Sequence, residues 1–278
     1  MRSTIDAFFE RANYLNGLLY HLEAQLELFR NSFRTNQQNV IPYPGAFSSL
    51  LIRDLTERPS HGWQVPYQSG AFSTSGEAFL DLVDILLARE AAWATANGFE
   101  AFETCVKDLL VDYYLAVPSS VKADRLSKEE QNLKKKGLMR GSREFWSTYV
   151  RRNFKSADKA LDEIRRVARQ LEEAEQHNSY RRDLIKWFTL VSEVRHAVVH
   201  SNLTIVKSRW DSLTSDPRFV PDVFFSGVLG TTGYELRPSV EQATNALTGL
   251  LEYGYAAFKA LSIAGQTDWC VFPQQGQQ

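Results

Sequence analysis

One short segment near residue 200 concentrates side chains that could do acid–base or phosphate chemistry. It reads Glu193-Val194-Arg195-His196-Ala197-Val198-Val199-His200-Ser201-Asn202. The preceding turns are apolar at helical spacing, so the segment is expected to end a helix. Burying an arginine, two histidines and a glutamate without partners is costly. We therefore expect the helix to carry these groups either to the core, with partners, or to a boundary between two protomers.

Three interpretations of this segment are open from its residues alone. In the first, Glu193 pairs with Arg195 or a neighbour, and the histidines are satisfied core residues or helix caps. In the second, His196 and His200 bind a metal from one helix face. Against this, the segment does not have the glutamate of the zinc-binding motif H-E-x-x-H, and no third ligand lies nearby in the sequence. In the third, a neutral histidine takes the 2′-hydroxyl proton of RNA and an arginine holds the phosphate as charge develops. That chemistry requires no metal, no cofactor and no covalent nucleophile.

The elements that would position this segment are mostly helical. Apolar residues at spacings of three and four predict helices over the following ranges: 5–34, 77–117, 143–177, 179–200 and 238–263. Asn97-Gly98 marks a kink or a break in the second of them. Ser142 is a candidate helix cap. Short apolar runs on either side of Gly230-Thr231-Thr232 predict a hairpin.

The order of these elements predicts an all-α fold, a helical bundle with a long N-terminal helix and a small β-hairpin insertion before the last helix. We expect residues 1–75 to form an N-terminal helix and a loop extension, with the loop over 36–75. Residues 76–265 are expected to form the helical domain, with a polar connection over 118–142. Residues 266–278 are expected to form a flexible tail.

Composition and absent motifs exclude several classes of protein. With 278 residues, 44% hydrophobic and 23% charged, the chain is typical of a globular protein rather than a disordered one. It has no phosphate-binding glycine loop and no G-x-S-x-G elbow. The two cysteines, Cys105 and Cys270, stand far apart, and Cys105 is expected to be a buried free thiol. That cysteine usage, the lack of a signal peptide and the lack of an apolar stretch of 18 residues predict a cytoplasmic protein without a membrane partner.

The near-neutral net charge of −1 conceals a basic region. Residues 121–169 contain 15 Lys or Arg against 7 Asp or Glu, a balance of +8. Within it, Lys134, Lys135 and Lys136 are consecutive. A run of this kind is either a solvated helix surface or a track for an RNA backbone, and RNA binding through it would depend strongly on salt.

The run from Arg195 to His200 resembles the R-x(4–6)-H signature of the HEPN superfamily (higher eukaryotes and prokaryotes nucleotide-binding). The usual form is an acidic residue, arginine, a polar residue that is often Asn, small and β-branched residues, then histidine. Phe99-Glu100-Ala101-Phe102-Glu103 also resembles the first helix of several prokaryotic HEPN groups. The resemblance covers about residues 77 to 264 and leaves residues 1–75 unexplained.

The resemblance implies an α-helical homodimer in which the motif residues of two protomers share one cleft. Arg195 would then stabilise the charged transition state, and His200 would be the general base or acid. His196, in the slot that most often holds Asn, would position the phosphate. Glu193 would orient Arg195, and Asn202 is a further supporting candidate. Asn202 also stands where some members carry a modified tyrosine, so regulation through that tyrosine is not supported.

We therefore expect a metal-independent endoribonuclease of HEPN type, with RNA as substrate. The resemblance implies a role in a toxin–antitoxin, abortive-infection or other antiviral system, with a cognate antitoxin or a defence-complex protein as a further partner. The alternative is a non-catalytic dimeric HEPN scaffold, a regulatory or nucleotide-binding subunit of a defence complex. The joint presence of Arg195 and His200 favours the enzyme, because a scaffold has no need of both.

Overall fold

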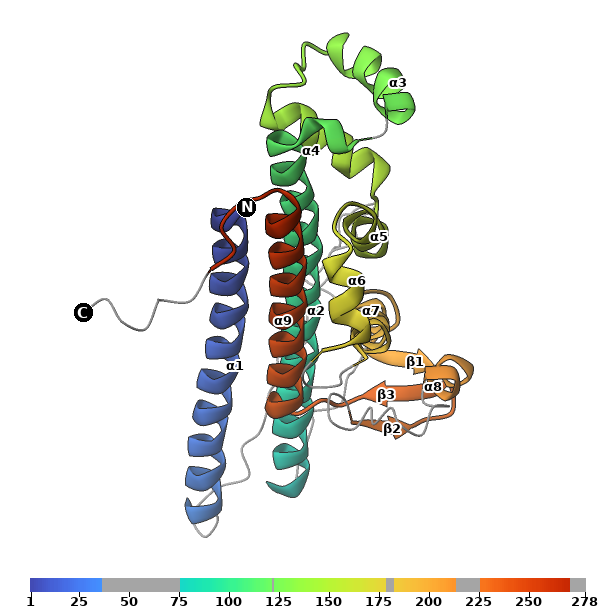
Figure 1. The fold of residues 1–278 in the computed structure, drawn as a ribbon. Helices are drawn as coiled ribbons and strands as arrows, with labels where there is room; N and C mark the ends of the chain where they lie inside the picture. Colours follow the sequence, from blue (N-terminus) through green and yellow to red (C-terminus); the bar gives the residue numbers. More distant parts are fainter. Residues whose placement is uncertain (37–75, 122, 179–182, 214–225, 271–278) are drawn as a thin grey trace, which may run out of the picture. The chain divides into compact units, whose positions relative to one another are not determined.

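The computed structural model describes residues 1–36, 76–121, 123–178, 183–213 and 226–270. Its elements in chain order are α1 (Arg2–Asn36), α2 (Gly76–Ala116), the 3-10 helix η1 (Pro118–Ser120), α3 (Ala123–Lys134), α4 (Arg143–Asn153), α5 (Ala157–Val167), α6 (Gln170–Gln176), α7 (Leu184–His200), β1 (Thr204–Val206), α8 (Lys207–Leu213), β2 (Gly227–Leu229), β3 (Gly233–Leu236) and α9 (Val240–Ala264). The predicted all-α class with a long N-terminal helix is confirmed (Figure 1). None of the described helices combines the length and the apolar character that a membrane crossing requires.

The chain falls into two compact units, Met1–His21 with Ala88–Gln278, and Leu22–Leu87. In the second unit, Arg30 forms ion pairs with Glu27 and with Asp84. The loop expected over 36–75 lies outside the described residues, apart from Asn36, which ends α1. The last eight residues of the expected tail, 271–278, also lie outside them.

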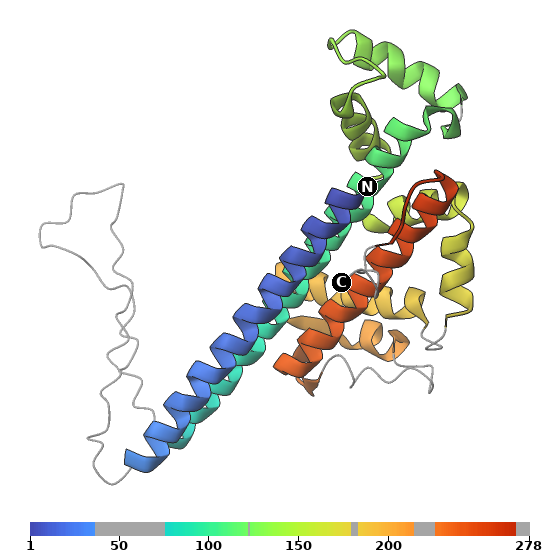
Figure 2. The same ribbon diagram turned by 60° about the vertical axis from the view of Figure 1, so that its left-hand side comes forward.

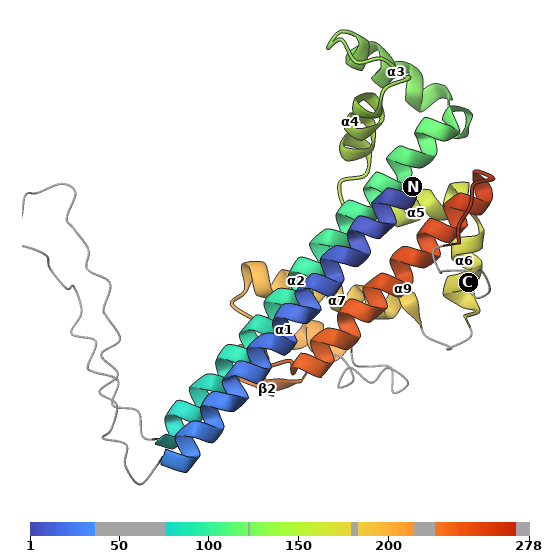
Figure 3. The same ribbon diagram turned by 90° about the vertical axis from the view of Figure 1, so that its left-hand side faces the viewer.

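The core of the first unit is built around the ring of Phe102 on α2. Its centroid lies 6.1 Å from that of Phe8 on α1, 5.6 Å from that of Tyr253 on α9 and 5.6 Å from that of Phe188 on α7. Figures 2 and 3 show α9 running beside α2, and the first turns of α1 lying against both. Four helices distant in the sequence therefore meet at one aromatic residue.

Helix α2 runs unbroken through Asn97-Gly98, so the alternative of a break into two helices is wrong. A Cβ atom at Gly98 would lie 2.3 Å from a side-chain carbon of Leu247 on α9. Glycine therefore serves the close approach of two helices at this point, and packing against α9 supports the helical conformation that glycine alone disfavours.

The basic region is more finely divided than its periodicity predicts. The expected connection over 118–142 contains η1 and α3, and the expected single helix over 143–177 is three helices, α4, α5 and α6. Ser142 does cap α4, since its hydroxyl accepts from the amide of Phe145 at 3.2 Å. Phe154 and Ala168, at the two breaks, are buried. Tertiary burial of these residues outweighs the helix propensity of their neighbours.

The predicted hairpin is confirmed, and a third strand joins it. β2 and β3 pair antiparallel, and β1 pairs with the other edge of β3, with Thr204 opposite Glu235. The ring of Trp210 on α8 stacks on Tyr234 of β3 at 4.6 Å. The last helix is predicted to start at residue 238, and α9 starts two residues later, at Val240. Ser239 caps it through a capping box with Gln242.

Two buried carboxylates tie α5 and α6 to the long helices. Tyr114 of α2 donates to Glu163, which also accepts from Arg166 at 2.5 and 2.9 Å. In the same arrangement, Tyr253 of α9 donates to Glu175, which accepts from Arg165 at 2.8 to 3.1 Å. Burial, followed by the nearby carboxylate, raises the pKa of each tyrosine, so both phenols remain protonated donors.

We expect Glu175→Ala to lower the free energy of unfolding by about 3–5 kcal/mol, because it leaves the Arg165 guanidinium and the Tyr253 hydroxyl without their buried partner. Tyr253→Phe leaves the ion pair intact and is expected to cost about 1–3 kcal/mol. Urea unfolding followed by circular dichroism measures both. Glu172→Ala, at an exposed position of the same helix, is the control and should change stability by under about 1 kcal/mol. Equal losses in Glu175→Ala and Glu172→Ala would contradict the assignment.

Candidate functional site

Helix α7 carries the predicted site residues on its last two turns. It begins at Leu184 rather than at the expected residue 179, and the carboxylate of Asp183 caps it by accepting from the Lys186 amide at 3.0 Å. Residues 179–182 lie outside the described ranges. One side of α7 is buried through the following residues: Trp187, Phe188, Leu190, Val191, Val194, Ala197 and Val198. The packed side fixes the direction in which the polar residues of the last turns project.

His196 and His200 are exposed, so they are not the core residues that the first interpretation allowed, and only its helix-cap alternative stays open. They fall on the side of α7 opposite the buried positions, and their ring centroids lie 5.0 Å apart. Val199 lies on the same exposed side. No group of three or more His, Cys, Asp or Glu side chains that could hold a metal occurs among the described residues. The pair is thus open to solvent or to a partner.

Arg195 is held by Glu100 of α2, across 95 positions of sequence. Its Nε lies 2.7 Å and its Nη2 lies 2.5 Å from the same carboxylate oxygen, Oε1. The side chains are 30% and 52% exposed. An ion pair this open stabilises a fold by no more than about 1 kcal/mol. Arg195 is therefore positioned by α2 but can exchange its carboxylate for another anion at little cost.

Glu193 binds Arg209 of α8 and not Arg195, so the expected orienting contact is absent from this structure. Nε and Nη2 of Arg209 lie 3.0 and 2.6 Å from Oε1 of Glu193. The hydrogen bond raises the pKa of Arg209. The reason is helical geometry, since residues two apart on a helix do not face one another. This spacing rule could have been applied to the sequence. The sequence did not identify Glu100 as the partner of Arg195, because the two residues lie 95 positions apart on different helices.

Asn202 ends α7 rather than joining the histidines. Its φ is 47° and that of Leu203 is 65°, both in the left-handed region. The turn lets the amide of Leu203 donate to the carbonyl of Ala197 at 2.9 Å. The Asn202 side chain accepts from Arg89 of α2 at 3.5 Å, a long contact. Its main role is to stop the helix directly after His200.

The three lysines lie elsewhere in the fold. Lys134 is the last residue of α3 and pairs with Glu130 at 2.9 Å, and exposed Lys135 and Lys136 form the turn that follows. Figures 1 and 3 place α3 near the C-terminal end of α2 and α7 nearer its middle. A single protomer therefore does not bring the lysines together with Arg195 and His200. Arg165 and Arg166, in the same basic region, are committed to buried carboxylates.

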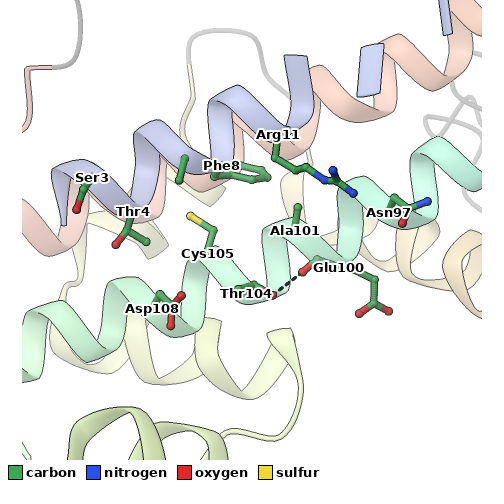
Figure 4. A pocket seen from close by; sticks show the side chains of 11 residues that line it. Ser3, Thr4, Phe8, Arg11, Asn97, Glu100, Ala101, Thr104, Cys105 and Asp108 are labelled. Carbon is green, nitrogen blue, oxygen red and sulfur yellow. Dashed lines mark hydrogen bonds between the residues drawn. The ribbon is translucent and has the colours of Figure 1, made fainter. Parts of the chain in front are cut away.

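A groove of about 510 Å³ with a mixed polar and apolar lining lies between α1 and α2 and reaches Glu100 (Figure 4). Thr4 and Arg11 line it from α1, and Glu100, Cys105 and Asp108 line it from α2. Cys105 is buried and free, as predicted, and burial raises the pKa of its thiol, which keeps it protonated and unreactive. Burial also raises the pKa of Asp108, against the opposing effect of nearby arginines. The groove contains no activated nucleophile.

The left-handed turn after α7 predicts how position 202 responds to substitution. We expect Asn202→Gly to retain the melting temperature, because glycine adopts positive φ without strain. Asn202→Val should lower the free energy of unfolding by about 1–3 kcal/mol, because a β-branched residue is strained there. Thermal unfolding of both variants measures this. If valine were tolerated as well as glycine, the turn would not have this conformation.

No family model, curated protein or solved structure matches this chain. What the site does is therefore inferred from its own geometry and from the resemblance of its motif to that of HEPN proteins.

Proposed function

We propose that this protein is a metal-independent endoribonuclease of HEPN type that acts as a homodimer, with Arg195 and His200 of both protomers in a shared active site. The observation that carries the proposal is the set of charged and titratable groups on the last turns of α7: half-buried Arg195, paired with Glu100, and the exposed imidazoles of His196 and His200, whose ring centroids lie 5.0 Å apart. A purely structural role gives no reason for both imidazoles to lie on the exposed side of the helix next to this arginine.

Helix geometry explains why a second protomer is needed. Residues five apart on a helix are rotated by roughly 140°, so Arg195 and His200 of one chain diverge, whereas His196 and His200 are only about 40° apart. A twofold arrangement of two α7 helices can bring the arginine of one protomer to the histidines of the other. Val199, 42% exposed beside the histidines, offers apolar surface for that contact.

The chemistry is a transfer within the RNA strand. A neutral histidine takes the proton of the 2′-hydroxyl, whose oxygen attacks the adjacent phosphorus. The bond to the 5′-oxygen breaks, and a protonated histidine gives that oxygen a proton. The products are a 2′,3′-cyclic phosphate and a 5′-hydroxyl end. Arg195 stabilises the additional negative charge on the phosphoryl oxygens in the transition state.

Arg195 must release Glu100 to hold a phosphate. The pair is exposed, so little stability is lost when the carboxylate moves away. In the free protein, Glu100 holds the guanidinium in place before the anion arrives. The toxin–antitoxin or antiviral role and an antitoxin or defence-complex partner belong to the same proposal and are supported by the resemblance alone. The cytoplasmic location also belongs to it and is supported by the cysteine usage.

We expect wild-type protein in excess EDTA to fragment cellular RNA, and Arg195→Ala and His200→Ala each to reduce the rate by roughly 10²–10³, as for loss of a charge stabiliser or of a general acid–base group. Electrophoresis of the RNA and mapping of the fragment ends measure this. His177→Ala, which removes an exposed histidine at the end of α6, is the matched control and should cleave like wild type.

All proteins are first compared by size-exclusion chromatography, so that a lost dimer is not mistaken for a lost catalyst. Cleavage by both site variants at the wild-type rate would overturn the proposal. Absence of cleavage by every protein, with dimers intact, would favour the non-catalytic scaffold instead.

A separate prediction concerns RNA affinity and the three lysines at the end of α3 and in the turn that follows it. We expect replacement of Lys134, Lys135 and Lys136 by alanine to weaken RNA binding and to reduce the slope of log K against log[salt] by about 2, since each phosphate contact contributes roughly 0.7 for a single strand. Fluorescence anisotropy over a salt series measures the slope. The triple arginine variant retains the charge and should keep the wild-type slope. An unchanged slope in the alanine variant would assign these lysines to a solvated surface.

A further inference from the structure

An exposed tryptophan lies on α2 between the two contacts that link α2 to the end of α7. Positions 89, 93, 96 and 100 share one stripe of a helix. On this stripe Arg89 reaches Asn202, and Glu100 holds Arg195. Trp93 stands between them and is 47% exposed. The indole therefore lies beside the turns of α7 that carry the proposed active site.

Trp93 differs from the other tryptophans of the described ranges. Trp146, Trp187 and Trp210 are buried, and the ring of Trp269 is covered by the Lys259 ammonium at 4.1 Å. Within those same ranges Trp93 makes no stacking or cation–π contact with another side chain. Along the stripe it is followed by the buried Ala96, and the charged residues Arg89 and Glu100 lie at the two ends. A large flat apolar surface is thus presented to solvent among charged groups.

We infer that Trp93 is a nucleobase-binding subsite, on which an unpaired base of the RNA stacks beside the phosphate held by Arg195. This inference rests on the proposed function and names its substrate class as single-stranded RNA. Two observations favour a nucleotide. The indole offers a stacking face, and the guanidinium groups of Arg89 and Arg195 lie at either end of the stripe to receive the flanking phosphates.

Stacking requires a base that is not paired within a helix, so the subsite selects single strands over duplexes. The contribution of one stacked base to binding corresponds to a loss of roughly five- to 150-fold on replacement by alanine. Because any base has a π face, the subsite is expected to tolerate all four bases.

The test uses the full chain with His200→Ala, so that RNA is bound without being cut. Affinities for a fluorescein-labelled 12-nucleotide single strand and for the corresponding duplex are measured by anisotropy. We expect Trp93→Ala to weaken single-strand binding roughly five- to 150-fold and to leave duplex binding unchanged. Trp93→Phe retains a ring and should keep most of the affinity. Trp269→Ala, at the other tryptophan that is exposed within the described ranges, is the matched control and should bind like the parent.

Equal single-strand affinity of Trp93→Ala and its parent would overturn the inference. Loss of the dimer on size-exclusion chromatography in both Trp93 variants would also overturn it, by assigning the ring to a protein interface. The proposed function is judged separately by cleavage with the wild-type chain. If the wild type cleaves RNA and Trp93→Ala binds the single strand as tightly as its parent, only the stacking subsite is overturned. If no protein cleaves or binds RNA, both the subsite and the proposed function are overturned.

Discussion

The orientation of the candidate site depends on one aromatic side chain, Phe188 of α7, which packs against α2 and α9. Its ring lies 5.3 Å from Phe99, 5.6 Å from Phe102 and 5.9 Å from Tyr253. Burial of these rings is worth several kcal/mol and fixes the rotation of α7 about its own axis. Once that rotation is set, positions 196, 199 and 200 must face away from the core. The exposure of both histidines is thus a consequence of packing two turns earlier.

Charged groups fall into two classes according to their burial. Glu163 and Glu175 are buried and are each satisfied by a tyrosine and an arginine, so they hold α5 and α6 in place. Breaking such a pair leaves an uncompensated charge in the interior. The pair of Arg195 with Glu100 is exposed and can open without loss of the fold. Rigid ion pairs therefore belong to the scaffold, and an exchangeable one belongs to the candidate site.

Periodicity and capping residues predicted the elements whose ends are determined locally. The end of α7 at His200, the cap of α4 at Ser142, the hairpin before α9 and the unbroken apolar face of α9 all follow from nearby residues. The predictions that were wrong concern elements whose ends are determined by residues distant in the sequence. Gly98 does not break α2 because Leu247 packs against it, and the basic region divides at Phe154 and Ala168 because the fold buries them. The motif itself was located from sequence, but the partner of Arg195 was not.

The exposed residues discussed above form two surfaces, one on α7 and one on α2. Val199 and the histidines lie on α7 itself, and the proposed active site takes its arginine from a second protomer because Arg195 and His200 of one chain diverge. Trp93 and Arg89 lie on α2, at the edge of that surface. An apolar contact through Val199 would leave the indole at the margin of a dimer cleft rather than inside it. In the proposed dimer, a single strand would then reach the histidines from the α2 side, with Trp93 at the entrance to the shared site.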